Sequence, residues 1–111
     1  MKKLFKCSVC NYIHEGADAP DTCPKCGVPK DKFVELSSEE AQKVYDSERT
    51  NDIHMEMITL AERIVKLAQE GIGINLDPPC VSAFEKAKNE VYVIKQRSKA
   101  ELEGHVKKGK W

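Results

Sequence analysis

Aromatic residues are scarce in this 111-residue sequence, at only 6% of the chain, and neither sign of charge is in excess. A large aromatic core is therefore not available. The 18 basic side chains balance 18 acidic ones. This balance argues against general nucleic-acid binding, which needs a basic excess to neutralise phosphates. With 41% hydrophobic residues, the composition suits one ordinary domain, or a small domain with a helical extension.

The sequence also lacks long apolar runs. No stretch approaches the roughly 20 apolar residues that a membrane-spanning helix needs. Two lysines follow Met1, but no long apolar segment comes after them, so the amino end does not have the pattern of a signal peptide. We therefore expect a cytoplasmic protein with no membrane partner. In the reducing cytosol, paired cysteines bind metal more often than they form disulfides.

Glycine and proline are almost missing from long stretches after Leu36, whereas three of the five prolines come before it. We therefore predict two domains, a cysteine-rich module over residues 1–36 and a helical part over residues 37–111. Ser37 and Glu40 fit a capping box at the start of a first helix, at about residues 38–70.

A Gly-Ile-Gly segment at residues 71–73 is expected to end this first helix. Asp77 and the two prolines after it then provide an N-cap and a first turn for a second helix, at about residues 78–103. Gly104 or Gly109 is the expected end of the second helix. The two helices together predict a hairpin.

Two adjacent apolar stripes follow the first helix at heptad-like spacing. The first stripe is Ile53, Met57, Leu60, Ile64 and Leu67. The second stripe is Ile58, Ala61, Val65 and Ala68. The later helix has one main stripe, formed by Phe84, Ala87, Val91, Ile94, Ser98 and Leu102. A helix with two stripes has two neighbours, so we expect two hairpins to associate as a dimeric four-helix bundle. The alternative is a hairpin that folds back on the cysteine module.

Four of the five cysteines form two CxxC pairs with twelve residues between them: Cys7, Cys10, Cys23 and Cys26. Each CxxC turn can place two sulfurs on one metal, and two turns complete a tetrahedral shell. Asn11 and Gly27 follow the pairs, and both residue types tolerate the positive φ of a tight turn that aims backbone N–H groups at sulfur. Iron and zinc both suit this shell, and a zinc knuckle that only holds the fold is an alternative. A pair of disulfides in place of a metal site is a more distant alternative.

The residues around the cysteines carry a further signal in YIHEG (12–16), Ala19-Pro20, CPKCGVPK (23–30) and Phe33. From about residue 4 to residue 35, this pattern closely resembles the short rubredoxin module of the rubrerythrins. Asn11 departs from the glycine common in that family. The resemblance implies a mononuclear iron, bound by the four cysteines, that cycles between ferric and ferrous states and carries one electron. Tyr12 and Phe33, with Phe5, are expected to form the small apolar core of the module.

Rubrerythrins pair this module with a four-helix di-iron domain that reduces peroxide, which raises the question of a second metal site. Such sites need Glu-x-x-His on two helices, and no glutamate in this chain has a histidine three residues later. The nearest substitutes are two groups that a dimer would duplicate: Glu101 with His105, and Asp52, His54 and Glu56. A solvated charged face is the simpler interpretation of these residues.

The sequence thus predicts a small metal-bound rubredoxin-like module of strands and knuckles, joined to an all-α helical hairpin. The first functional hypothesis is one-electron transfer to a redox partner protein, with the helices used for dimerisation or docking. The alternatives are a truncated rubrerythrin-like peroxide reductase with a di-iron site at the dimer interface, and a zinc-stabilised interaction module. The hypothesis leans away from an enzyme. Cys80, in the first turn of the second helix, is interpreted as a small apolar contact.

Overall fold

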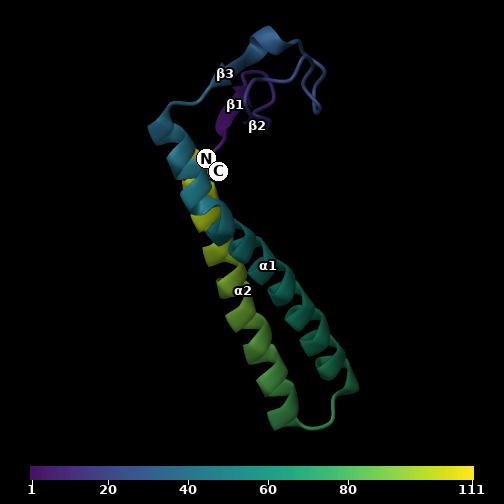
Figure 1. Cartoon of the computed structure of the whole chain (residues 1–111). Coiled ribbons are helices and arrows are strands. Elements are labelled where there is room, and N and C mark those ends of the chain that lie inside the picture. Colours follow the sequence, from purple (N-terminus) through teal and green to yellow (C-terminus); the bar gives the residue numbers. More distant parts are fainter. The chain divides into compact units, whose positions relative to one another are not determined.

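The computed structural model describes all 111 residues, Met1 to Trp111. Three short strands come first: β1 (Lys3–Cys7), β2 (Ile13–Gly16) and β3 (Phe33–Glu35), with a 3-10 turn, η1 (Lys30–Lys32), before the third. Two long helices follow, α1 (Ser38–Ile74) and α2 (Pro78–Lys107) (Figure 1). By its internal contacts the chain divides into two compact units, Met1–Tyr45 and Asp46–Trp111.

The first unit is built on an antiparallel sheet with the strand order β2-β1-β3. The central strand pairs Phe5 with His14 of β2, and Cys7 with Phe33 of β3. Because side chains alternate across a strand, this register turns Phe5 and Cys7 to the same face of the sheet. The sheet therefore carries the first cysteine into the interior of the unit.

The core of this unit is small and consists of Leu4, Phe5, Cys7 and Cys23. Phe5 is buried as expected, but Tyr12 and Phe33 are only half-buried. Two of the four core residues are cysteines, so the apolar interior is too small to account for much stability by itself. This composition is typical of small domains that depend on a bound metal.

The capping box at the start of α1 is present. The Ser37 backbone N–H donates to the Glu40 carboxylate (2.9 Å), and the Glu40 N–H donates to the Ser37 hydroxyl oxygen (3.1 Å). These two bonds satisfy amides that have no partner inside the helix, which explains why α1 begins at Ser38. In the same unit, the Tyr45 hydroxyl donates to the Lys2 carbonyl oxygen (2.8 Å).

Helix α1 continues through Gly71 and Gly73 to Ile74, beyond the point where the sequence suggested an end. Gly71 is buried, and a Cβ atom added there would lie only 2.3 Å from the ring of Phe84 on α2. Close helix packing therefore accounts for the glycine at position 71. The residue that ends the helix is Asn75, with φ 54°, whose N–H donates to the Gly71 carbonyl oxygen (3.4 Å).

Asp77 caps the start of α2, because its carboxylate accepts a hydrogen bond from the Cys80 N–H (2.9 Å). The helix ends in a Schellman turn at Gly109, which has φ 73°. There the Lys110 N–H donates to the His105 carbonyl oxygen (2.8 Å). Gly109, rather than Gly104, is thus the stop signal at the end of α2.

In the second unit, α1 and α2 run antiparallel and side by side (Figure 1). Their buried residues are small or polar apart from one valine: Ser47, Asn51, Ala61, Ala68, Gly71, Val91 and Ser98. On α1, Ala61 and Ala68 belong to the second stripe, and Ser47 and Asn51 extend it toward the beginning of the helix. The second stripe therefore faces α2, and the small residues allow the two helices to approach each other closely.

The first stripe of α1 stays exposed. The fractional exposures of its five residues run from 39% for Ile53 to 57% for Leu67. Neither helix combines the length and the apolar character that crossing a membrane requires. A second helical neighbour for α1, and with it the dimeric bundle, remains a prediction.

Candidate metal centre

The two CxxC segments form equivalent turns. The Cys7 N–H donates to the Tyr12 carbonyl oxygen (2.8 Å), and the Cys23 N–H donates to that of Val28 (2.9 Å). In each case the donor and acceptor lie five residues apart. This repeated pattern gives the two loops the same shape, so that each can present its pair of sulfurs in the same way.

A left-handed residue closes each turn, as the sequence predicted. Asn11 has φ 68° and Gly27 has φ 80°. Their N–H groups donate to the Cys7 and Cys23 carbonyl oxygens, both at 3.0 Å. Asparagine is the non-glycine residue that most readily takes this conformation, so the departure from glycine at position 11 leaves the turn intact.

The four sulfurs converge on one point. The Sγ atoms of Cys7 and Cys26 lie 3.7 Å apart, and those of Cys10 and Cys23 lie 3.6 Å apart. All four lie within 4.8 Å of one another. A tetrahedral site with metal–sulfur bonds of about 2.3 Å requires sulfur–sulfur separations of about 3.8 Å. The arrangement therefore fits a single tetrahedral metal ion, and four thiolate donors suit iron or zinc.

Backbone N–H groups favour the thiolate form of two ligands. Burial raises the pKa of the Cys23 thiol, but the N–H groups of Cys26 and Lys25 outweigh it and lower that pKa to about 6. The pKa of Cys7 is also lowered, because N–H groups of Cys10 and Val9 outweigh burial there. A thiolate that accepts such bonds is prepared to bind a cation.

Cys10 behaves in the opposite way. Burial, together with its cysteine neighbours, raises the pKa of its thiol to about 12. Negative charge on nearby sulfurs opposes further ionisation, so four thiols this close do not all lose their protons without a compensating cation. Metal binding at this site should therefore release protons.

The loop between the two knuckles is held by Asp18. Its carboxylate accepts hydrogen bonds from the Ala19 N–H (2.8 Å) and from the Lys30 ammonium group (2.5 Å). The Lys30 ammonium group beside it holds the pKa of Asp18 below its usual range. His14 lies on β2, and the side chains that converge on the metal site are the four cysteines alone.

The residues predicted as substitutes for a second metal site are only partly brought together. The rings of His54 and His105 have centroids 6.3 Å apart, and the Glu101 carboxylate lies 3.7 Å from His105 Nε2. Asp52 and Glu56 are exposed on α1. The four cysteines are the only group of three or more candidate ligands whose donor atoms converge.

The two histidines instead belong to a hydrogen-bonded cluster between the helices. His105 Nδ1 lies 2.5 Å from Oδ1 of the Asn51 side-chain amide. Because an amide oxygen can only accept a hydrogen bond, His105 Nδ1 is the donor. Asn51 also donates to the Lys110 carbonyl oxygen (2.8 Å), as does the Ser47 hydroxyl (2.7 Å). The cluster thus joins the Schellman turn of α2 to α1.

Sequence reasoning missed this cluster, although a signal was present. Ser47, Asn51 and His54 continue the spacing of the second stripe, at positions where an apolar residue would be expected. His54 Nδ1 lies 3.0 Å from the hydroxyl of Ser98, the polar member of the α2 stripe. Polar residues at interior positions of both helices therefore indicated a matched polar contact.

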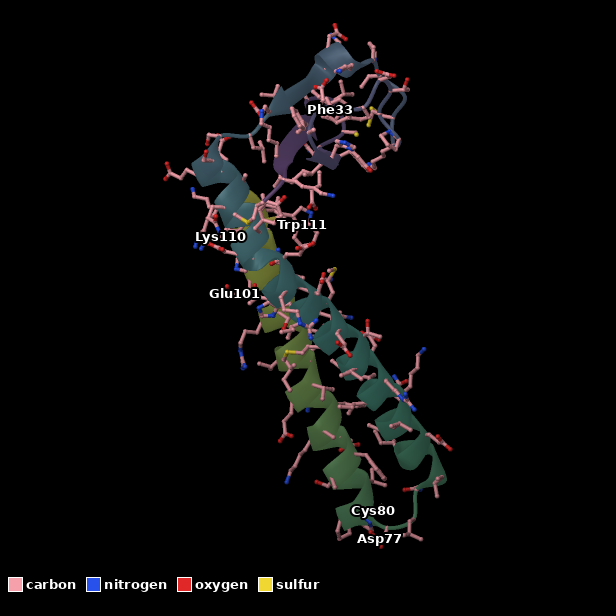
Figure 2. The ribbon with its side chains drawn as sticks, in the orientation of Figure 1. Phe33, Asp77, Cys80, Glu101, Lys110 and Trp111 are labelled. Atoms are coloured by element: carbon pink, nitrogen blue, oxygen red, sulfur yellow. The ribbon has the colours of Figure 1, made fainter.

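Cys80 belongs to the hairpin and is not part of the four-cysteine cluster. It is found beside Asp77 at the start of α2, whereas Glu101 and Lys110 lie toward the other end of that helix (Figure 2). Its side chain is half-buried and is not among the converging sulfurs. The structure thus assigns four of the five cysteines to one site.

These observations define the first unit as a small tetrathiolate metal-binding domain. Residues 5–34 match the family described as the rubredoxin-like domain of rubrerythrin. The chain therefore carries an N-terminal rubredoxin-like domain, which is followed by a two-helix hairpin.

Two curated relatives extend this result. The chain is 44% identical to reverse rubrerythrin-1 of Clostridium acetobutylicum over 78 residues, which cover 70% of this chain and 38% of the relative. It is 48% identical to rubrerythrin of Nitratidesulfovibrio vulgaris over 29 residues, which cover 26% of this chain and 15% of the relative. No solved structure matches the chain.

The first of these matches is longer than the rubredoxin-like domain, so it necessarily reaches into the helices. The match also spans less than half the length of each relative. The similarity therefore supports a shared domain and part of a helical segment.

Proposed function

We propose that this protein carries single electrons at a mononuclear iron centre held by Cys7, Cys10, Cys23 and Cys26. The convergence of four sulfurs at tetrahedral spacing carries this proposal. The similarity to rubrerythrin-type rubredoxin domains favours iron over zinc as the bound metal. When bound, iron supplies a ferric–ferrous couple in this all-thiolate site.

The chain's own groups suit the negative charge of such a centre. N–H groups of both knuckles lie close to sulfur and lower the pKa of Cys7 and Cys23. The same bonds would stabilise a tetrathiolate in both oxidation states, and more strongly in the more negative reduced state. The protein thus provides fixed dipoles that need no rearrangement when an electron arrives.

The burial of the ligands differs in a way that fits electron exchange. Cys7 and Cys23 are buried, whereas Cys10 is half-buried and Cys26 is exposed. One side of the site therefore reaches the surface, and a partner protein can approach the Cys10 and Cys26 side. The partner is expected to be another redox protein. We expect the hairpin to set the oligomeric state of the chain or to dock that partner.

The test is to purify the full chain under anaerobic conditions and to count iron and zinc. The visible spectrum is recorded before and after addition of dithionite. The proposal predicts one iron per chain and a coloured oxidised form that bleaches on reduction. One iron per chain is expected because the chain has only one group of four converging cysteines.

Two outcomes would contradict the proposal. A colourless zinc form that persists after iron-replete expression would favour a zinc-stabilised interaction module. More than one iron per chain, together with peroxide turnover, would favour the peroxide reductase with a site in the helices. A potassium ferricyanide titration of the reduced protein should count one electron per iron if the proposal holds.

A further inference from the structure

The exposed first stripe is unusual for a helix in a small protein. Leu60 is 50% exposed at its centre, with Met57 and Ile64 exposed by 40% and 42% on either side. Continuous apolar surfaces of this kind mark interaction sites more often than ordinary solvent-facing surface. The first stripe is offset from the second by one residue, or about 100° around the helix. A helix with neighbours near right angles fits one corner of a four-helix bundle.

Four charged residues follow the outer edge of the first stripe at seven-residue intervals: Arg49, Glu56, Arg63 and Glu70. Their signs alternate along α1. All four are exposed, and none takes part in an ion pair within the chain. The charges are therefore available to another molecule that covers the stripe.

These four charges are placed symmetrically about the middle of the first stripe, with opposite signs at equal distances. Arg49 and Glu70 are equally distant from the point between Thr59 and Leu60, and so are Glu56 and Arg63. If two copies of α1 pack antiparallel about that point, each charge faces the opposite charge on the same edge. Such flanking charges set partner choice and orientation in helical assemblies.

We propose that the first stripe binds a second copy of this chain, with the two α1 helices antiparallel about a two-fold axis between Thr59 and Leu60. The interface has the Leu60 side chains at its centre. Arg49 then pairs with the partner's Glu70, and Glu56 with the partner's Arg63. Each pair occurs twice because the interface is isologous. This arrangement does not depend on which metal the cysteines bind.

Other arrangements lack this complementarity. In a parallel pair about a two-fold axis along the helices, the charged edges of the two copies lie on opposite sides of the interface, so Arg49 and Glu56 face no charge of this set on the partner. In a pairing of α1 with the partner's α2, the corresponding edge of α2 offers mainly uncharged residues: Ser82, Asn89, Gln96 and Glu103. Both alternatives leave the charges along α1 without partners, and the antiparallel pair is favoured over them for that reason.

The proposed axis also determines which residues of α2 lie at its level. Glu62 and Lys95 form an ion pair across the hairpin, so these residues lie at one level on the two helices. The point between Thr59 and Leu60 is then level with about residue 97 of α2. Arg97, which is exposed and charged, lies at that level, and the uncharged Val93 and Ala100 lie on either side of it. The two copies of α2 can therefore approach each other there only if their Arg97 side chains turn away from the axis.

The first test is charge reversal in the full, metal-loaded chain, with the dimer dissociation constant measured by sedimentation at low salt. Arg63→Glu should raise this constant about tenfold, because it places two carboxylates together at two symmetric positions. Adding Glu56→Arg restores both pairs, so the double variant should return to within about threefold of the original chain. Glu85→Arg, an exposed charge on α2 outside this face, is the matched control and should have no effect.

Circular dichroism at 222 nm checks that each variant keeps its helices. If Arg63→Glu loses helix, Glu70→Arg with and without Arg49→Glu makes the same comparison at the other pair. A chain that is monomeric throughout the concentration range would overturn the proposal. A double variant that dimerises no better than the single one would overturn the antiparallel pairing.

Cysteine cross-linking tests orientation directly, with Cys80→Ser as the background. Leu60→Cys lies next to the axis and should form a disulfide-linked dimer under mild oxidation. Ile53→Cys should not, because 13 residues then separate the two new thiols along the helices, or about 20 Å. Cross-linking of Ile53→Cys as fast as Leu60→Cys would show a parallel pair and would refute the proposal.

Discussion

The interior of the rubredoxin-like domain and the interior of the hairpin contain different kinds of residue. In the domain, half of the buried core is cysteine, represented by Cys7 and Cys23 beside Leu4 and Phe5. In the hairpin, the buried residues are mostly small or polar, and the large side chains of the first stripe are outside.

This difference shows two ways in which a short chain can compensate for a small core. The domain has convergent thiolates, and a bound metal would connect its two knuckles from the inside. The hairpin has close contacts between small residues and an apolar surface on the opposite side of α1. On the proposal above, a second copy supplies the remaining apolar contacts from the outside. The predictions below separate these two sources of stability.

Removing one metal ligand should give the largest effect and should affect only one unit. Cys23→Ser is expected to reduce bound metal from one per chain to near zero, because Cys23 is buried and has the most stabilised thiolate. Tetrathiolate sites can contribute on the order of 10 kcal/mol to the folding of small domains. Metal analysis and the visible spectrum should report the loss, while the helical signal at 222 nm stays nearly constant.

Cys80→Ser is the matched control for this prediction, because Cys80 is the one cysteine outside the cluster. It should leave both metal content and helicity unchanged. Metal loss in this control, or melting of the helices in Cys23→Ser, would mean that the two units do not depend on separate sources of stability.

A pair of glycines tests the close packing in the hairpin. Gly71→Ala introduces a Cβ atom that meets the Phe84 ring at 2.3 Å, so either the ring or one of the helices must shift. We expect a destabilisation of about 1–3 kcal/mol in urea unfolding followed at 222 nm. Gly73→Ala has no atom within 4 Å of the new Cβ, and helix propensity should stabilise α1 by up to about 1 kcal/mol.

Both variants should keep their bound metal, since neither glycine lies in the rubredoxin-like domain. Equal effects of the two substitutions would show that helix propensity, and not contact with Phe84, determines the role of Gly71. The comparison is made at one protein concentration, because the stability of an associating chain depends on concentration.

Local chemistry explains why part of the structure could be predicted from the sequence. The CxxC turns with Asn11 and Gly27, and the capping box at Ser37, each use residues within a few positions of one another. Such short-range rules can be read in order along the chain. The four convergent sulfurs followed from the same reasoning, and the structure brings them together.

Long-range contacts explain what the sequence did not reveal. The role of Gly71 depends on Phe84, which is 13 residues away on the other helix, so the glycine was interpreted as a helix end. The contacts of Asn51 with His105 and Lys110 depend equally on the register of the hairpin. Heptad spacing predicted two apolar stripes on α1, but it did not show which of them faces α2 or identify the partners of the polar residues there.

The smallest predicted effect concerns Glu62 and its ion pair with Lys95 across the hairpin. Lys95 holds the pKa of the Glu62 carboxyl below its usual range. A carboxyl with a lowered pKa in the folded state contributes stability above its unfolded pKa of about 4.3. That contribution is lost as the pH falls through the folded-state pKa. Solvent screens the pair, because the Glu62 side chain is 47% exposed, so the effect should be modest.

Urea midpoints of the original chain and of Glu62→Gln, measured from neutral to acidic pH, test this expectation. The original chain should be slightly more stable near neutral pH, and the difference should disappear below the folded-state pKa of Glu62, since the carboxylate is then protonated. Glu85→Gln, which removes a carboxylate without an ion pair, is the control and should show no such pH-dependent difference. If the advantage over Glu62→Gln grew on acidification, the ion pair would not be its source. Stability of the hairpin interface would then depend on packing alone, in sharper contrast to the charge-dependent cysteine site.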